Sequence, residues 1–313
     1  MMQVKDIYQR FLECSGVNTD TRNIDKGSMF FALKGPNFDA NKYAASAIAK
    51  GSKYVVVDDP SIVMSDEYIL VEDCLSTLQE LAKFHRSKLS IPVIGITGSN
   101  GKTTSKELID AVLKTQYRVC STIGNLNNHI GVPLTLLSIK QTDEIAIVEM
   151  GANHVGEIEF LCDLCNPNYG LITNIGKAHL EGFGSIENII KTKRALYNSV
   201  YNNDGLTFVN KSDSLLLDLS DCDKSVYFQD ENSFFAKLDF INSGELAFSY
   251  YKNDFKSSII KTHLVGDFNL TNVMAAISIG YYFNISVENI HLALTEYKPQ
   301  NNRSQYLKAI RTL

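Results

Sequence analysis

Apolar positions recur every three or four residues in several stretches of the first part of the chain, which is the spacing of amphipathic helices. Near the N-terminus this spacing is carried by five residues: Val4, Ile7, Tyr8, Phe11 and Leu12. It also predicts helices at residues 43–50 and 75–87, while shorter runs at 28–33 and 53–57 predict extended strands. Residues 88–92 are expected to be a linker, because proline disfavours helix in the residue before it. We therefore predict a small α/β domain at residues 1–88.

After this linker the pattern changes to strand-like runs that alternate with helical segments. The runs lie at residues 92–97, 144–150 and 169–175, and the helical segments at 102–114, 155–165 and 185–200. Such alternation predicts a mostly parallel sheet joined by right-handed crossovers. Residues 206–263 show short alternating strands, which we assign to an antiparallel section with a turn at 242–244, and helices should follow at 269–283 and 286–295. The second predicted domain spans residues 89–300.

The balance of charges narrows the range of functions. The 30 Lys and Arg residues and 35 Asp and Glu residues give a net charge of −5, whereas proteins that bind nucleic acid through bulk charge carry a basic surplus. No apolar run approaches the ~20 residues that a membrane-spanning helix needs. Six cysteines in 313 residues are too sparse for a disulfide framework. We expect a mildly acidic cytoplasmic globular protein with no nucleic-acid partner and no membrane span.

The strongest local motif is the string Ile-Gly-Ile-Thr-Gly-Ser-Asn-Gly-Lys-Thr-Thr at residues 94–104. It follows a predicted strand and opens a predicted helix, as a phosphate-binding loop does. Lys102 would neutralise phosphate charge and Thr103 would bind Mg²⁺, although Ile96 stands where the strict pattern has glycine. The alternative is a glycine-rich turn with a solvated lysine.

Two residues at strand ends are candidate ligands for Mg²⁺. Glu149 ends the predicted strand at 144–150, and His179 follows the strand at 169–175. In parallel sheets such carboxyl ends lie at the same edge, which is where ligands bind. The alternatives are a solvated carboxylate and a structural histidine.

Lys193 lies on the apolar face of its predicted helix. That face is formed by Ile186, Ile189, Ile190, Tyr197 and Val200. Periodicity alone favours a lysine whose stem packs while its amine reaches water. The other interpretation is a buried amine of lowered pKa that reacts with CO₂ and becomes a carbamate ligand for Mg²⁺.

Two further strings are less specific. The loop at residues 124–133 is rich in asparagine, and its Asn125 and Asn128 are expected to face substrate or phosphate. Cys162 and Cys165 have the spacing of a zinc knuckle, but no second pair accompanies them, so we do not predict zinc.

Taken together, these strings resemble the Mur ligase family, ATP-dependent enzymes that form amide bonds in cell-wall synthesis. The resemblance covers nearly the whole chain, with blocks at residues 20–35, 97–104, 127–133, 149–152, 178–185, 266–272 and 301–305. The block at 178–185 is most similar to members that add D-alanyl-D-alanine. One departure is Arg194-Ala195, where many members have glycine and glutamate.

The resemblance implies a role for each matching residue. ATP would be bound by Thr97, Gly98, Ser99, Asn100, Gly101, Lys102, Thr103, Thr104, Asn272 and Arg303. The UDP-linked substrate would be bound by Thr21, Arg22, Lys34, Asn125 and Asn128. Mg²⁺ would be held by Thr103, Glu149, His179 and a carbamylated Lys193, and the catalytic set would be Lys102, Glu149, His179 and Lys193.

The implied fold is a small α/β UDP-binding domain followed by a phosphate-loop ATPase domain with a mostly parallel sheet. The implied reaction joins D-alanyl-D-alanine to UDP-N-acetylmuramoyl-tripeptide through an acyl phosphate, in a monomer. Residues 301–313 would begin the family's C-terminal Rossmann-like domain, so this chain alone is expected to be inactive. The alternatives are a sibling ligase that adds a diamino acid at position three or glutamate to folate, and a non-catalytic fragment that binds nucleotide and UDP-sugar.

Overall fold

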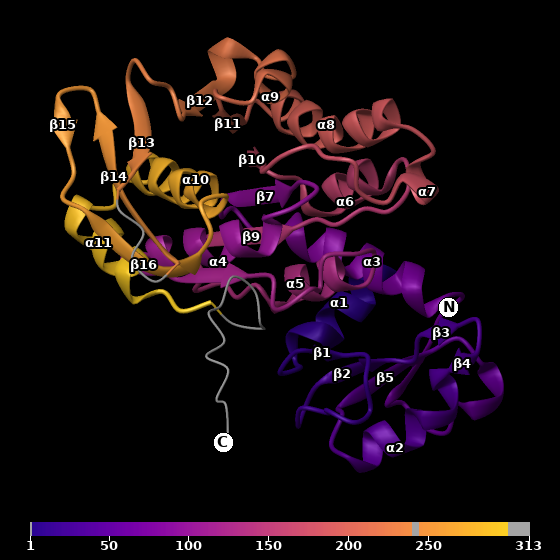
Figure 1. The fold of residues 1–313 in the computed structure, drawn as a ribbon. Coiled ribbons are helices and arrows are strands. Elements are labelled where there is room, and N and C mark those ends of the chain that lie inside the picture. Colours follow the sequence, from indigo (N-terminus) through magenta and orange to yellow (C-terminus); the bar gives the residue numbers. More distant parts are fainter. Residues whose placement is uncertain (1, 240–243, 300–313) are drawn as a thin grey trace, which may run out of the picture. The chain divides into compact units, whose positions relative to one another are not determined.

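The computed structural model describes residues 2–239 and 244–299, which form two compact units (Figure 1). The first unit contains Met1–Ser90, Leu126–Gln141 and Asp163–Cys165. The second contains Ile91–Asn125, Thr142–Cys162 and Asn166–Leu313. Within the described ranges, no helix combines the length and the apolar character that a membrane crossing demands.

The first unit is built on a parallel sheet. Its strands run in the order β1 (Val17–Asn18), β2 (Met29–Phe31), β5 (Tyr54–Val57) and β6 (Tyr68–Leu70). Its helices include α1 (Val4–Leu12), α2 (Ala44–Ala49), α3 (Cys74–Arg86) and α5 (Gly131–Ser138), and β3 (Lys34–Gly35) pairs with β4 (Phe38–Asp39). The expected strands and helices of this part are confirmed, and most of their apolar residues are buried.

Side chains of α3 tie the separate segments of this unit together. The His85 ring contacts Tyr8 Oη of α1 at 3.2 Å and Ile139 O beyond α5 at 2.9 Å. The Arg86 guanidinium donates to Cys165 O at 2.8 Å. Segments far apart in the sequence therefore share one core.

The second unit contains a six-stranded parallel sheet. Its order is β12 (Ser225–Phe228), β11 (Leu206–Asn210), β10 (Tyr169–Ile172), β7 (Val93–Thr97), β9 (Ile145–Glu149) and β8 (Val119–Ser121). The helices that connect these strands include α4 (Lys102–Leu113), α6 (Glu157–Cys165), α7 (Leu180–Phe183), α8 (Ile186–Asn202) and α9 (Ser214–Asp218). The predicted parallel sheet with alternating helices is confirmed.

Residues 206–228 differ from the sequence expectation. They were assigned to the antiparallel section, but β11 pairs in parallel with β10, and β12 pairs in parallel with β11. The short helix α9 provides the crossover between them. Apolar residues on two successive short strands do not distinguish a hairpin from a tight parallel crossover, so the pattern alone led to the wrong pairing.

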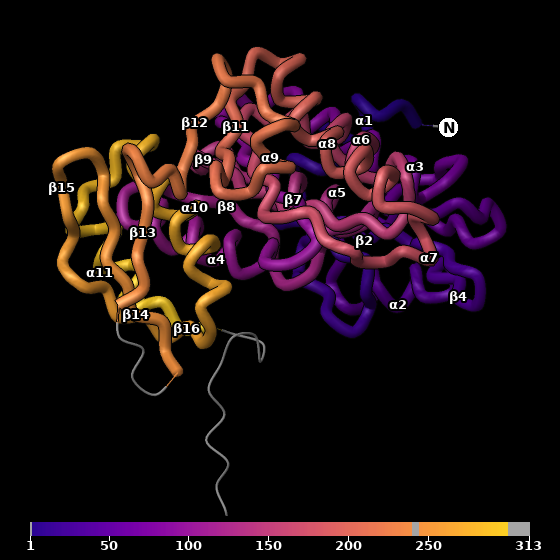
Figure 2. Tube along the Cα trace, turned by 45° about the horizontal axis from the view of Figure 1, so that its top comes forward, coloured from indigo at the N-terminus to yellow at the C-terminus, as the bar shows by residue number. Residues whose placement is uncertain are grey.

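The antiparallel section begins at β13. It consists of β13 (Phe234–Leu238), β14 (Glu245–Lys252), β15 (Phe255–Lys256) and β16 (Ile260–Val265). In both views these strands gather beside α10 (Asn269–Tyr282) and α11 (Val287–Glu296), whose expected positions are confirmed (Figures 1 and 2). The predicted turn at 242–244 falls largely outside the described residues.

Candidate active site

The loop between β7 and α4 has the backbone conformation of a phosphate-binding loop. Gly98 and Gly101 have φ values of +151° and +79°, which residues with a side chain rarely adopt. A Cβ atom at Gly98 would lie 1.9 Å from Thr173 Oγ1, and one at Gly101 would lie 2.6 Å from Asn272 Oδ1. Both positions therefore require glycine, and the loop opens directly into the N-terminus of α4, where backbone N–H groups favour anions.

The segment that follows β10 holds this loop in place. Ser99 N donates to Asn174 O at 2.9 Å, and the Asn174 side chain bonds both Asn100 N and Asn100 O. Thr173 Oγ1 donates to Asn100 O at 2.6 Å, and Ser99 Oγ donates to Gly176 O at 3.0 Å. The sequence analysis missed Thr173 and Asn174, although they directly follow a buried strand, the feature that singled out Glu149.

Lys102 lies over the loop that it follows. Its Nζ donates to Gly98 O at 2.8 Å and to Ser99 O at 3.3 Å. The ammonium therefore stands on the loop where phosphate charge would be neutralised. Thr97 Oγ1 instead donates to Met150 O, which joins the end of β7 to the end of β9.

Thr103 and Glu149 form the centre of the candidate metal site. Thr103 Oγ1 donates to Glu149 Oε1 at 3.1 Å, and the two residues are only 4% and 1% exposed. A hydroxyl and a carboxylate are the oxygen donors that Mg²⁺ prefers. The chemistry of this pair fits a magnesium ion beside the phosphate loop.

Lys193 is buried on α8, where it is only 3% exposed. Its amine does not reach water along the surface, which contradicts the interpretation that periodicity alone favours. Burial and, as the smaller cause, the nearby Lys102 ammonium together lower the pKa of Lys193 to about 8. The two lysines are thus close enough to affect one another.

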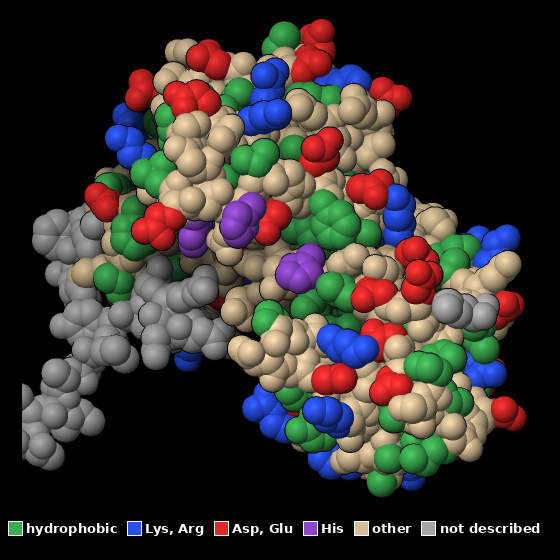
Figure 3. Space-filling view, turned by 90° about the vertical axis from the view of Figure 1, so that its right-hand side faces the viewer, with side chains coloured by type: hydrophobic (Ala, Val, Ile, Leu, Met, Phe, Trp, Pro, Cys, Tyr) green, Lys and Arg blue, Asp and Glu red, His purple; other side chains and the backbone are tan. Residues whose placement is uncertain are grey.

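His179 is in a more exposed position than the other predicted metal ligands. It begins α7 with a φ of +54°, and its side chain is exposed. It borders a hollow of about 650 Å³ that is also lined by Asn153, His154, Leu180, Glu181 and Gly182. Figure 3 shows exposed histidine side chains on one face of the molecule.

Asn272, the predicted contact to the adenine base, lies against the start of α4. Its Oδ1 accepts from Ser105 Oγ at 3.0 Å, and its Nδ2 donates to Asn269 Oδ1 at 3.0 Å. It therefore braces the same turn that Gly101 opens. Thr104 is buried in that turn, while Arg303 lies outside the described residues.

The two predicted asparagines of the loop after β8 differ in their surroundings. Asn125 is exposed. Asn128 Oδ1 accepts from Ile130 N at 3.0 Å and from Gly131 N at 2.9 Å, which stabilises the start of α5. This local bond explains the polar character of the second position.

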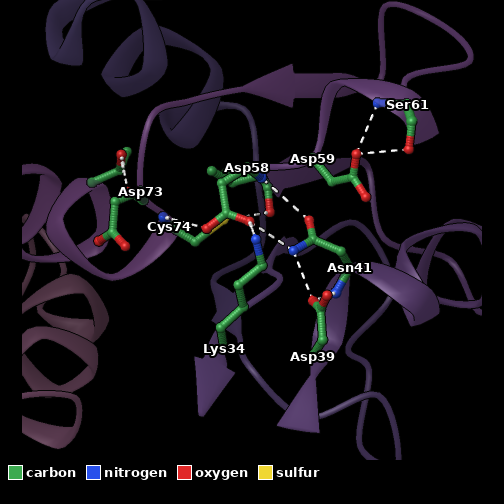
Figure 4. A network of polar contacts seen from close by, with 10 residues as sticks. Lys34, Asp39, Asn41, Asp58, Asp59, Ser61, Asp73 and Cys74 are labelled. Atoms are coloured by element: carbon green, nitrogen blue, oxygen red, sulfur yellow. Dashed lines mark hydrogen bonds and ion pairs between the residues drawn. The ribbon is translucent and has the colours of Figure 1, made fainter. Parts of the chain in front are cut away.

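In the first unit, Lys34 belongs to a polar network at the end of β5 (Figure 4). Its Nζ lies 2.7 Å from Oδ1 of the nearly buried Asp58. Asn41 Nδ2 donates to both Asp58 Oδ1 and Asp39 Oδ1, and Cys74 N donates to Asp58 Oδ2. Burial acts to raise the pKa of Asp58, but the bonds from Lys34 and Asn41 outweigh it and lower that pKa. Lys34 is a residue that the sequence predicts for this site, whereas its partner Asp58 carries no motif and was not predicted.

Thr21 and Arg22 lie in an exposed turn. The Arg22 guanidinium pairs with Asp20 at 2.6 Å, and its hydrogen bonds lower the pKa of Asp20 to about 2. Thr21 O accepts from Lys50 Nζ at 2.7 Å. Thr21, Arg22 and Lys34 all lie in the first unit, on the residues that lead into and out of β2.

Comparison with known proteins identifies the family. The family model of the Mur ligase middle domain matches residues 96–280, more than half of the chain. The UDP-N-acetylmuramoyl-tripeptide–D-alanyl-D-alanine ligase of Bacillus subtilis is 38% identical over 295 residues, which cover 94% of this chain and 64% of that protein. The corresponding ligase of Buchnera aphidicola from Baizongia pistaciae is 33% identical over 93% of this chain and 64% of its own length.

Solved structures agree with this relationship. A crystal structure of MurF from Acinetobacter baumannii superposes with a TM-score of 0.84 at 27% identity, over 99% of this chain and 71% of that one. MurF ligase from Thermotoga maritima in complex with ADP gives 0.78 at 26% identity, over 96% and 68%. This chain spans about 64% of the length of the Bacillus ligase. It belongs to the Mur ligase family, as a homologue of its MurF-type members.

Proposed function

We propose that this chain provides the acceptor-binding and ATP-binding parts of a ligase that joins D-alanyl-D-alanine to UDP-N-acetylmuramoyl-tripeptide. The observation that carries the proposal is the buried Thr103–Glu149 pair, 3.1 Å apart, directly beside a phosphate loop. The names of the similar ligases support the choice of substrates. We place the reaction in the cytoplasm and in a monomer.

ATP would be bound by the backbone amides of residues 98–104 and by the Lys102 ammonium, with Asn272 and Arg303 on the adenine side. Mg²⁺ would be held by Thr103, Glu149 and Lys193, with His179 joining from the start of α7. When bound, this ion supplies positive charge that stabilises the phosphoryl group during transfer. Thr21, Arg22 and Lys34 would bind the UDP part of the acceptor, and Asn125 and Asn128 would contact the substrate nearer the reaction.

Lys193 would act as a carbamate. Its neutral amine adds to the carbon of CO₂: an N–C bond forms while one C=O π bond opens to place its electron pair on oxygen, and one proton leaves to solvent. The lowered pKa makes the neutral amine available near neutral pH. The product is an anion, so the repulsion between Lys193 and the Lys102 ammonium becomes an attraction.

The ligation would proceed in two steps. The tripeptide carboxylate attacks the γ-phosphorus of ATP, which gives an acyl phosphate and ADP. The amine of D-alanyl-D-alanine then attacks the acyl carbon, and phosphate and a proton leave as the amide forms. Lys102 and the loop amides position the phosphates, which is the main contribution that protein groups make to phosphoryl transfer.

The experiment is to measure ADP release with each acceptor and amine in turn, in a longer ligase that includes the residues of this chain. We expect release that requires UDP-N-acetylmuramoyl-tripeptide and D-alanyl-D-alanine together. Release with the dipeptide acceptor and a diamino acid would show a sibling ligase instead.

A second candidate function is nucleotide and UDP-sugar binding without turnover. It concerns the residues of this chain taken by themselves, which match 64% of the length of the Bacillus ligase. The 313-residue chain would then bind ADP with Mg²⁺ yet release no ADP from ATP in the presence of both substrates. Turnover near that of a longer ligase assayed beside it would exclude this candidate.

A further inference from the structure

A second lysine is buried on the helix that follows the phosphate loop. Lys106 is 3% exposed, and its Nζ donates to Thr122 O at 2.6 Å. A buried ammonium is costly unless it is hydrogen-bonded, so this contact is strongly favoured where it occurs. Lys106 lies one helical turn after Thr103 and therefore projects from the same side of α4.

Thr122, which accepts that bond, is also bonded to Glu149. It directly follows β8 and is 1% exposed. Its Oγ1 accepts from Glu149 N at 3.0 Å, and its own N donates to Ile147 O at 3.0 Å. The last residue of β8 that pairs with β9 is Ser121, opposite Ile147. Beyond it, the Thr122 hydroxyl accepts the bond from Glu149 N that a strand carbonyl would otherwise accept.

Helix α4 thus holds Glu149 at two points. Thr103 bonds its carboxylate directly, while Lys106 bonds the residue that holds its backbone. We infer that Lys106 is a positioning residue for the metal-binding carboxylate: acting through Thr122, it fixes the end of β9 so that Glu149 meets Thr103. This inference rests on the assignment of Thr103 and Glu149 to Mg²⁺ under the proposed function.

The reach of lysine suits this role. A flexible four-carbon stem carries the ammonium from the helix to the strand end, and an apolar residue of equal length would fill the space without donating to Thr122 O. Without that bond, the backbone of Thr122 is free to rotate. Its hydroxyl is then no longer held in position to accept from Glu149 N. Groups that orient a metal ligand in this way typically contribute about 10- to 100-fold in metal affinity.

The test compares matched variants of the full chain. Lys106→Met removes the donor but keeps the length, and Lys114→Met removes an exposed lysine from the same helix, where it pairs with Asp110 at 2.6 Å. Thr122→Val removes the hydroxyl, and Thr122→Ser keeps it. Affinity for Mn²⁺ in the presence of ADP is measured by electron paramagnetic resonance, and ADP affinity in EDTA by calorimetry.

We expect Lys106→Met and Thr122→Val to weaken Mn²⁺ binding about tenfold or more, with ADP affinity in EDTA within about twofold of wild type. Lys114→Met and Thr122→Ser should match wild type in both measurements. If Lys106→Met does not fold, Thr122→Val tests the second bond of this chain, from Glu149 N to the Thr122 hydroxyl, with the lysine in place.

Two results would overturn the inference alone. Equal Mn²⁺ affinity in wild type, Lys106→Met and Thr122→Val would show that the carboxylate needs no such support. Equal losses of ADP affinity with and without metal would show a general effect on the loop. A wild-type chain that binds no Mn²⁺ with ADP would instead overturn the proposed function and the inference with it.

Discussion

Two lysines in the second unit, Lys106 on α4 and Lys193 on α8, are buried to the same extent but have opposite surroundings. Lys106 points its ammonium at the carbonyl of Thr122, a partner that stabilises positive charge. Lys193 lies near another ammonium, that of Lys102, and its pKa is lowered to about 8 by burial and by this neighbour. The difference teaches that burial alone does not assign a role to a lysine: the Lys106 ammonium has a carbonyl to bond, whereas Lys193 faces a like charge and has a lowered pKa.

The largest effect on the rate of ligation is expected for substitution of Lys193. Lys193→Ala should lower the rate of ligation by about 10²–10³-fold, since an anionic ligand near the transferring phosphoryl group is lost. Added formate or acetate should restore part of the rate by filling the vacated position. The measurement is ADP release in an actively ligating enzyme. Full activity of Lys193→Ala or Lys193→Arg would exclude the carbamate.

A smaller effect is expected for Lys102, whose ammonium donates to carbonyls of the phosphate loop. Lys102→Ala should weaken ATP binding about ten- to hundredfold, because one charge-assisted contact contributes on the order of 1.5–3 kcal/mol. The melting temperature should change little, since the Lys102 ammonium donates to the loop carbonyls of Gly98 and Ser99 rather than packing in the apolar core. Calorimetry with ATP and a thermal melt give the two readouts. Unchanged affinity would contradict the phosphate-loop assignment.

The pH dependence of stability should distinguish the two buried lysines. The folded pKa of Lys193 lies below its unfolded value, so between about 8 and the ordinary lysine value of 10.5 the unfolded chain binds more protons and stability rises with pH. Below that window the buried charge is a cost, which Lys193→Met removes. We therefore expect Lys193→Met to raise the melting temperature by several degrees at pH 7 and by less at pH 10.

Lys106→Met serves as the comparison in the same melts. It removes a bonded cation, so it should lower the melting temperature at pH 7, where Lys193→Met raises it. A gain in stability from Lys106→Met would show that the bond to Thr122 does not compensate for the burial of the charge, and the contrast between the lysines would fail.

The smallest expected effect concerns the influence of one lysine on the other. Lys102→Met removes the like charge beside Lys193, so the pKa of Lys193 should rise, though by less than burial has lowered it, because burial is the larger cause. The carbamate formed from ¹³C-labelled CO₂ should then appear at higher pH in NMR spectra. A control is Lys114→Met, whose exposed lysine pairs with Asp110 on the outer part of α4. An unchanged pH profile in Lys102→Met would mean that the two amines do not interact.

The sequence predicted those elements that are determined by residues close together in the chain. The phosphate loop and α4 follow from glycines at left-handed positions and a strand before them. The burial of Lys193 follows from helical periodicity, although the choice between a solvated and a buried amine did not. In the first unit, local patterns indicated Lys34 but not its partner Asp58, because the two residues are more than 20 positions apart in the sequence.

The sequence by itself determined many of the strands and helices, the glycine-rich loop before α4, the burial of Ile189, Lys193, Tyr197 and Val200 on one face of α8 and, through its motifs, the family. Tertiary structure alone decided the parallel pairing of β11 and β12, the bracing of the loop by Asn174, and the chain of bonds from Lys106 through Thr122 to Glu149. The physical reason is range. Periodicity and turn chemistry act over a few residues, whereas a hydrogen bond to a strand end depends on which strands the sheet brings side by side.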